Sequence, residues 1–243
     1  MEWPGFVNSV AEMLPIRDDA PRSSTPYVNY FLIALNVAVF LFEMILQPFA
    51  QQQFVFQFGF VPARSTSFLL GQHSIGMAAA FLPILTSMFL HANWPHVLGN
   101  MWFLYIFGDN VEDHFGHFRY LVMYLLSGIV GSLLHTVFYS GSNQPTVGAS
   151  GAIAGVMGAY FVLYPRSRVL TLTPFFFFIW LPAWVMLGYW FVVQFLSGAA
   201  TAFTASQQTG GGIAVWAHVG GFIAGIVLLK LFPSRPRRYQ YYS

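Results

Sequence analysis

Long apolar segments recur along the chain, and they constrain its fold more than any other feature of the sequence. Six of them are predicted to be helices, at residues 27–47, 94–115, 118–139, 150–164, 174–197 and 213–232. A helix that crosses a bilayer needs about 20 apolar residues, and its backbone must satisfy its own hydrogen bonds there. Charged residues make up only 7% of the chain, which is too few to cover a water-facing surface. We therefore expect an all-α, polytopic membrane protein with a bundle of six transmembrane helices.

The basic residues predict the orientation of this bundle. With six helices, nine of the ten Lys and Arg residues fall on one side of the membrane, and only Arg64 falls on the other. Because basic loops favour the cytoplasm, both termini are expected there, in a multi-pass protein of the cell membrane. Residues 1–26 lack the basic start and apolar run of a cleaved signal peptide. We divide the chain into a cytoplasmic segment (1–26), one six-helix domain (27–232) and a basic cytoplasmic tail (233–243).

Two outer loops and one short helix bear on where a site could form. Residues 48–90 are rich in Phe and are expected to form partial helices in the membrane interface. Residues 198–212 end in three glycines and are expected to be mobile. The helix at 150–164 would be only about 22 Å long, against a hydrocarbon core of about 30 Å. Ser150 is therefore expected at the floor of a cavity that opens to the outer side.

Four polar side chains from three helices are predicted to lie at one depth in this apolar protein. His96 and Asn100 share a face of the helix at 94–115, Ser150 opens the helix at 150–164, and His218 lies early in the helix at 213–232. Polar residues inside a membrane are unfavourable and are usually functional. Their convergence predicts a functional site.

Glycine spacing predicts that two of these helices approach closely. The helix at 150–164 carries Gly151 and Gly155, and the last helix carries Gly221 and Gly225. Small residues at this spacing let helices meet at short range in membranes. That approach would bring the Ser150 hydroxyl within reach of the His218 imidazole, which is the arrangement of a nucleophile and its base. Each residue alone also fits a structural role, Ser150 as a small packing residue and His218 as an interhelical hydrogen bonder.

The positions of the acidic residues favour a catalytic Ser-His dyad over a triad that includes an acid. No Asp or Glu follows Asp113, and Glu43 is the only candidate for a third member. His135 is the rival base, whereas His91 and Glu112 are expected to have structural roles. The chain has no His-Glu-x-x-His motif, so we expect no metal and no other cofactor. The basic residues are assigned to topology, and nucleic acid is not expected as a partner.

Four motifs in order resemble the rhomboid family of intramembrane serine proteases. They lie at residues 91–100 (His-Ala-Asn-Trp-Pro-His-Val-Leu-Gly-Asn), 107–113 (Phe-Gly-Asp-Asn-Val-Glu-Asp), 148–152 (Gly-Ala-Ser-Gly-Ala) and 217–221 (Ala-His-Val-Gly-Gly). The resemblance implies a six-helix fold and cleavage of membrane-anchored proteins in or near their transmembrane segments. One departure is Leu82-Pro83, which stands about where many relatives carry Trp-Arg.

The resemblance also implies roles for the site residues. Ser150 would be the nucleophile and His218 the general base. Asn100 and His96 would stabilise the oxyanion with the Ser150 backbone N–H, although His96 also fits a role in orienting its loop. A substrate helix would enter between the helices at 94–115 and 174–197, the latter being loosely packed, and the loop before the last helix would act as a lid.

Two other functions stay open at this point. One is an inactive rhomboid-like chaperone or adaptor that binds transmembrane helices, which the presence of both Ser150 and His218 disfavours. The other is a small-solute transporter, which would require inverted repeats that the chain lacks.

Overall fold

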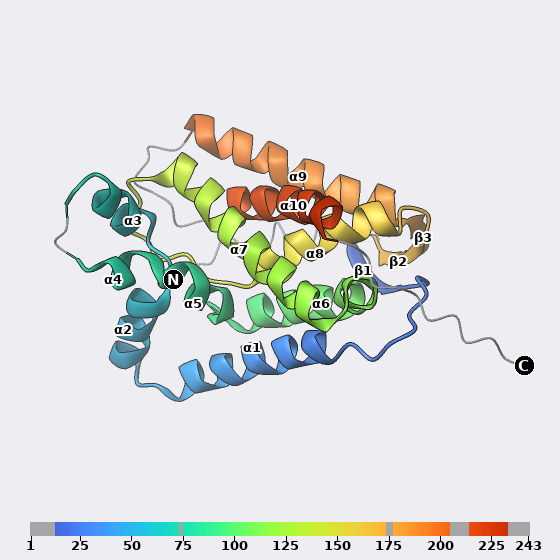
Figure 1. Ribbon diagram of the computed structural model, residues 1–243, viewed down its shortest axis with the longest axis horizontal. Coiled ribbons are helices and arrows are strands. Elements are labelled where there is room, and N and C mark those ends of the chain that lie inside the picture. The colour runs from blue at the N-terminus through green and yellow to red at the C-terminus, as the bar shows by residue number, and fades with distance from the viewer. Residues whose placement is uncertain (1–12, 73–74, 174–176, 205–213, 233–243) are drawn as a thin grey trace, which may run out of the picture.

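Helices form most of the molecule, and they match the apolar segments of the sequence. The computed structural model describes residues 13–72, 75–173, 177–204 and 214–232. The main helices are α1 (Tyr27–Ile45), α6 (Trp94–Phe115), α7 (His117–Tyr139), α8 (Ser150–Leu163), α9 (Ala183–Thr204) and α10 (Val215–Leu231). Figure 1 shows them as an elongated bundle in which α1 and α9 lie at opposite sides. The expected helical membrane protein is confirmed.

Helix lengths distinguish two groups within this bundle. Among the described residues, α1, α7 and α9 are long and apolar enough to cross a membrane, whereas α8 and α10 are shorter apolar helices. Helix α6 meets the same criterion only together with the segment Met77–Phe89, from which it is bent by 77°. The count of six membrane crossings therefore stays a prediction, although each of the six expected helices is present.

The prediction for the fifth helix was wrong at both ends. Residues 174–176 lie outside the described part of the chain, and Phe178–Pro182 forms a strand, β3, before α9 begins at Ala183. Helix α9 then continues to Thr204, past the expected end at residue 197. The outer loop is correspondingly shorter than predicted, and its residues 205–213 are not described, so its mobility stays a prediction.

A small sheet, absent from the sequence prediction, closes one end of the bundle. Strands β1 (Leu14–Asp18), β2 (Arg168–Leu172) and β3 pair antiparallel in the order β1-β2-β3. The backbone amide of Arg168 donates to the Asp19 carboxylate, and the Arg168 side chain forms an ion pair with it at 2.9 Å. The segment before α1 is thereby fastened to the loop after α8 (Figure 1).

Short helices fill the connection between α1 and α6, as expected for residues 48–90. They are α2 (Pro48–Phe58), α3 (Pro62–Leu69), α4 (Met77–Phe81), α5 (Pro83–Thr86) and a 3-10 turn at Ser87–Phe89. Three of them begin with proline, whose fixed φ and missing N–H suit the first helical position. In the Leu82-Pro83 pair, where many relatives carry Trp-Arg, Pro83 is the first residue of α5 and Leu82 is exposed. The location of these helices in a membrane interface stays a prediction.

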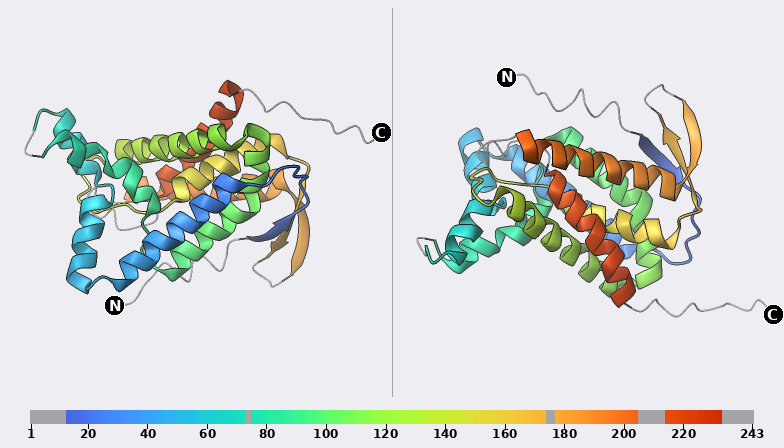
Figure 2. Two further views of the ribbon diagram at one scale, coloured as in Figure 1. Left: turned by 60° about the horizontal axis from the view of Figure 1, so that its bottom comes forward. Right: turned by 90° about the horizontal axis from the view of Figure 1, so that it is seen from above.

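Helix α8 lies at the centre and is almost entirely buried. Ten consecutive residues, from Gly151 to Tyr160, are buried against α6, α7, α9 and α10. A Cβ on Gly221 would lie 1.9 Å from the Gly151 carbonyl oxygen, and one on Gly225 would lie 1.8 Å from that of Gly155. Such contacts are possible only for glycine, so the predicted close approach of α8 and α10 is confirmed. Figure 2 shows α10 running between α7 and α9.

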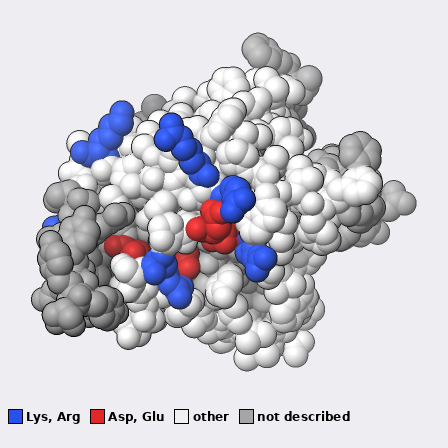
Figure 3. Space-filling view, turned by 90° about the vertical axis from the view of Figure 1, so that its right-hand side faces the viewer, with Lys and Arg blue, Asp and Glu red and all other residues white. Residues whose placement is uncertain are grey.

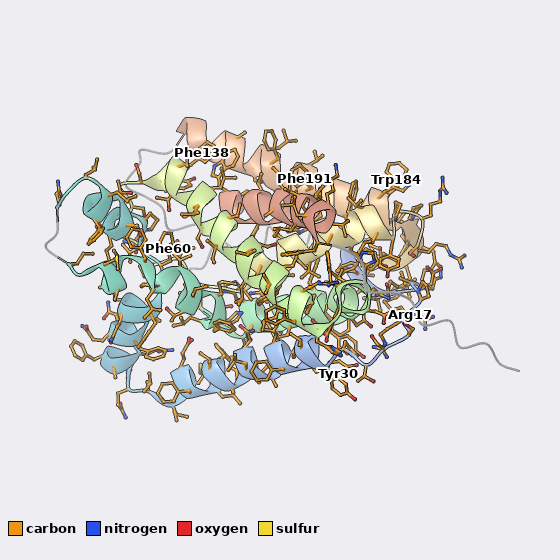
Figure 4. All side chains as sticks on the ribbon, viewed as in Figure 1. Arg17, Tyr30, Phe60, Phe138, Trp184 and Phe191 are labelled. Carbon is orange, nitrogen blue, oxygen red and sulfur yellow. The ribbon has the colours of Figure 1, made fainter. Side chains whose placement is uncertain are left out.

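Charged side chains gather at the end of the bundle that carries the sheet (Figure 3). Glu112 of α6 accepts hydrogen bonds from the backbone amides of Val28 and Asn29, at 3.0 and 2.7 Å. It thereby satisfies two of the free N–H groups that every helix leaves at its N-terminus. The expected structural role of Glu112 is confirmed. In Figure 4, Arg17 marks this charged end and Phe60 lies near the opposite one.

Candidate active site

Ser150 and His218 lie in hydrogen-bonding contact where α8 and α10 begin. The Ser150 Oγ is 2.7 Å from the His218 Nε2, although 68 residues separate the two in sequence. Ser150 is the first residue of α8 and is only partly buried, whereas His218 is buried. The glycine contacts between the two helices hold these side chains at this separation. A serine hydroxyl facing a neutral imidazole nitrogen can transfer its proton to that nitrogen as it attacks a carbonyl.

The other ring nitrogen of His218 faces α9. Its Nδ1 is 2.9 Å from the Gln194 Oε1, and Gln194 is 7% exposed. The Trp190 ring, one helical turn earlier, has its centroid 5.8 Å from that of the His218 ring. Gln194 was not among the residues predicted for the site. The available signal was its position as the only Gln in a long apolar helix, where a polar side chain is unfavourable unless it has a partner.

Gly148 brings His96 and Asn100 to the turn before Ser150. A Cβ on Gly148 would lie 2.7 Å from the His96 Cε1 and Nε2, and 3.6 Å from the Asn100 Nδ2. Gly148 also has φ +129°, a conformation that other residues rarely adopt. The Asn100 Nδ2 is buried and has no partner among the described residues. His96 and the unpaired Asn100 Nδ2 therefore lie beside Gly148, two residues before Ser150.

The N-terminus of α8 adds a favourable field at Ser150. The first N–H groups of a helix are unpaired within it, and the helix dipole places partial positive charge there. The N-cap residue, Ala149, supplies no side-chain hydrogen bond to these groups. Developing negative charge next to Ser150 would therefore be stabilised by the backbone as well as by Asn100.

A small cavity adjoins Ser150. It has a volume of about 20 Å³, and Ser132, Thr146 and Ser150 supply polar groups to its wall. A cavity of this size with polar partners has room for one water molecule. The expected opening of the site to the outer side stays a prediction.

The competing candidates lie elsewhere. His135 Nε2 lies 3.5 Å from the Thr146 hydroxyl, so the histidine in contact with Ser150 is His218. Glu43 is buried in α1, while the third position next to His218 is taken by Gln194. His91 is buried and lies edge-on against His96, at a centroid distance of 5.1 Å. The described residues contain no cluster of His, Asp or Glu side chains that could hold a metal ion.

Comparison with known proteins agrees with the motifs. Residues 78–235 match the model of the rhomboid domain. The chain is 31% identical over 166 residues to Rhomboid-like protein 11, chloroplastic, of Arabidopsis thaliana, covering 65% of this chain and 54% of the relative. It is 27% identical over 240 residues to RHOMBOID-like protein 1 of the same plant, covering 90% and 56%. It is 26% identical over 204 residues to Rhomboid protease GluP of Bacillus subtilis (strain 168), covering 84% and 34%.

The match covers the site and most of the helical core. The chain spans about half the length of the two plant relatives and about a third of GluP. The matched domain contains α6 to α10, and with them Ser150, His218, Asn100 and His96. The chain belongs to the rhomboid family.

Proposed function

We propose that this protein is an intramembrane serine endopeptidase that cleaves membrane-anchored proteins in or near their transmembrane segments. The observation that carries the proposal is the 2.7 Å contact between the Ser150 Oγ and the His218 Nε2, with the unpaired Asn100 Nδ2 beside Gly148 in the turn that precedes Ser150. A serine that served only to pack two helices would not need an imidazole and a free amide donor beside it. The similarity to a relative named as a rhomboid protease supports the same activity.

The reaction would follow the chemistry of acyl transfer. His218 Nε2 removes the Ser150 proton as Oγ bonds to the scissile carbonyl carbon, and the carbonyl electron pair moves onto oxygen. Asn100, His96 and the Ser150 backbone N–H stabilise that oxyanion. His218 then gives the proton to the leaving amine, and an acyl-enzyme forms. A water molecule, activated by His218, releases the second product and restores the serine.

Helix α9 is the element best suited to admit a substrate helix. Of residues 183–200, only Ala183, Met186, Leu187, Gln194 and Gly198 are buried, and their spacing places them on one face of the helix. Phe191, labelled in Figure 4, lies where α9 passes α10, and its ring is 4.7 Å from that of Phe222. Movement of α9 away from α6 would expose the site to the lipid side with the loss of few contacts. Transmembrane proteins and the surrounding bilayer are the partners that this route requires.

The orientation we propose places the charged end in the cytoplasm. The site lies at the starts of α6, α8 and α10, whereas Arg17 lies near Tyr105 and Asp109 in the second half of α6, and Arg168 follows the end of α8. The site would then face the outer side of a cell membrane, where water for hydrolysis is available. Reporter fusions to the loops after α7 and α8 would test this, because they must report opposite sides.

Labelling with a fluorophosphonate and cleavage of a single-span substrate test the activity together. We expect Ser150→Ala and His218→Ala to abolish cleavage while the variants keep their thermal stability in detergent. Wild-type protein should be labelled at Ser150, and Ser150→Ala should not be labelled. Cleavage by purified Ser150→Ala would refute the assignment. A wild-type protein that binds transmembrane helices but is neither labelled nor active would indicate the chaperone or adaptor function instead.

A further inference from the structure

Gln194 is a buried polar residue in an otherwise apolar helix, and it contacts the proposed base. Its Oε1 lies 2.9 Å from the His218 Nδ1. The exposed faces of α9 are covered with apolar and aromatic side chains, and Gln194 is turned inward from them. An amide inside a membrane protein is unfavourable unless it is hydrogen-bonded, so the contact accounts for its burial.

We infer that Gln194 is a positioning residue that fixes the tautomer and the ring plane of His218. An amide oxygen can only accept a hydrogen bond, so the Nδ1 that faces it must carry the proton. The Nε2 is then left with a free lone pair, and this lone pair faces the Ser150 hydroxyl at 2.7 Å. The opposite tautomer would place an N–H against the hydroxyl and could not accept its proton.

Trp190 supports the same ring from one turn earlier on α9. It lies four residues before Gln194 and therefore on the same helical face. Its ring centroid is 5.8 Å from that of His218 at an angle of 34°, and 6.3 Å from that of Phe222. The hydrogen bond thus sets the rotation of the imidazole, and the indole limits its tilt. Both constraints come from α9, so a movement of this helix that admits a substrate must be reversed before the base is held in place again.

The use of an amide follows from the surroundings of His218. A carboxylate at this place would bring a negative charge into an apolar interior, which is strongly unfavourable. A neutral oxygen orients the ring without that penalty. The neutral amide also explains how His218 can have an orienting partner in a chain that has no Asp or Glu after Asp113.

The inference rests on the proposed function and is tested with Gln194→Met and Gln194→Glu in the full chain. Met is close to Gln in shape but lacks the acceptor, whereas Glu keeps an oxygen at the same reach. Asn36→Leu is the matched control, since it removes a buried amide that bonds to Leu32 within α1. The readouts are kcat and KM on a single-span substrate, thermal stability, and the tautomer of His218 from 15N NMR of its ring.

We expect Gln194→Met to lower kcat by about 10- to 100-fold with KM within about 2-fold, part of the contribution of a general base. The His218 signal should change from one Nδ1–H tautomer to a mixture. Gln194→Glu keeps an acceptor, so it should keep the Nδ1–H tautomer and a kcat within a few-fold of wild type, while the charge that it buries lowers its thermal stability. Asn36→Leu should lower stability without changing the tautomer.

Two results would overturn the inference. One is an unchanged tautomer in Gln194→Met, whatever happens to its activity. The other is a loss of kcat that is equally large in Gln194→Met and Gln194→Glu and that follows their loss of thermal stability. Failure of the proposed function is distinguished by fluorophosphonate labelling of the wild-type protein. If Ser150 is not labelled, the activity is refuted, while the NMR measurement still decides whether Gln194 sets the tautomer.

Discussion

At the scale of single residues, Gly148 links the backbone to the oxyanion-stabilising candidates. The Gly148→Ala variant would combine a strained φ of +129° with a Cβ 2.7 Å from the His96 ring. We expect it to displace His96 and to lower kcat by about 10²-fold, similar to the loss of one oxyanion donor. The measurement is cleavage of a single-span substrate by purified protein.

A double-mutant cycle separates this effect from backbone strain. If the loss passes through His96, Gly148→Ala should have a much smaller effect in a His96→Ala background. Gly71→Ala is the matched control, because Gly71 also has a positive φ, +83°, but has open space around its missing Cβ. Equal losses of kcat in both backgrounds would contradict the role assigned to His96.

The sequence predicts the polar residues of the site better than it predicts their neighbours. Ser150, His218, His96 and Asn100 stand out because polar side chains are rare at that depth and recur at helical spacing. Gln194 was missed because it belongs to a helix whose start was predicted nine residues too early. With the wrong helix ends, its depth could not be matched to that of His218. A hydrogen-bond partner that is brought close only by tertiary packing, such as Gln194, is not indicated by the local sequence pattern.

At the scale of elements, the glycine contacts between α8 and α10 determine how closely the two halves of the site approach. Gly225→Ala would place a Cβ 1.8 Å from the Gly155 carbonyl oxygen, which neither backbone can avoid without moving. We expect a loss of stability of about 1–3 kcal/mol, the usual effect of overpacking a core. Thermal unfolding in detergent measures it.

Gly99→Ala provides the control for this change. Gly99 is also a helical glycine, but a Cβ there would meet no atom within 4 Å. Alanine is a better helix former, so this variant should gain up to about 1 kcal/mol. Equal stability of Gly225→Ala and wild type would show that α8 and α10 can separate freely.

Helix boundaries were predictable where capping residues or prolines mark them, and unpredictable where an apolar run changes its structure. The start of α6 is marked by Asn93, whose side chain accepts a hydrogen bond from the His96 backbone amide, and by Pro95. By contrast, residues 177–182 are as apolar as the helix that follows. Short apolar runs fit a strand as well as a helix, and pairing with β2 decided between them here.

At the scale of the whole molecule, the sheet and the charged side chains close one end of the bundle. Asp113 accepts hydrogen bonds from Ser23 and Ser24, and Arg22 forms an ion pair with Asp109 at 3.0 Å. The stretch before α1 is therefore attached to α6 as well as to β2. Sequence alone could not show this, because these contacts join polar residues about 90 positions apart that carry no periodic pattern.

Two neighbouring carboxyl groups at this end should give stability opposite dependences on pH. Burial raises the pKa of Asp18, whose carboxylate accepts a hydrogen bond from the Tyr160 hydroxyl. Hydrogen bonds from the backbone amide and the side chain of Arg168 lower the pKa of Asp19, although burial opposes them. The stability from Asp18 is therefore complete below its ordinary pKa of 3.8 and is lost as pH rises through its higher folded value. The stability that Asp19 contributes is present above its ordinary pKa of 3.8 and is lost as pH falls through its lower pKa in the folded protein.

Substitution by asparagine should expose this difference. Near neutral pH, we expect Asp18→Asn to raise the Tm by about 1–2 °C, because the buried charge is removed while an oxygen remains to accept from Tyr160. Asp19→Asn should lower it by a similar amount, because the charged acceptor for Arg168 is lost. Toward pH 3 the Asp18 variant should approach wild type, whereas the Asp19 variant should do so only as pH falls through the lowered pKa of Asp19. Thermal unfolding from pH 3 to pH 7 measures both, and shifts of the same sign near neutral pH would contradict the roles assigned to the pair.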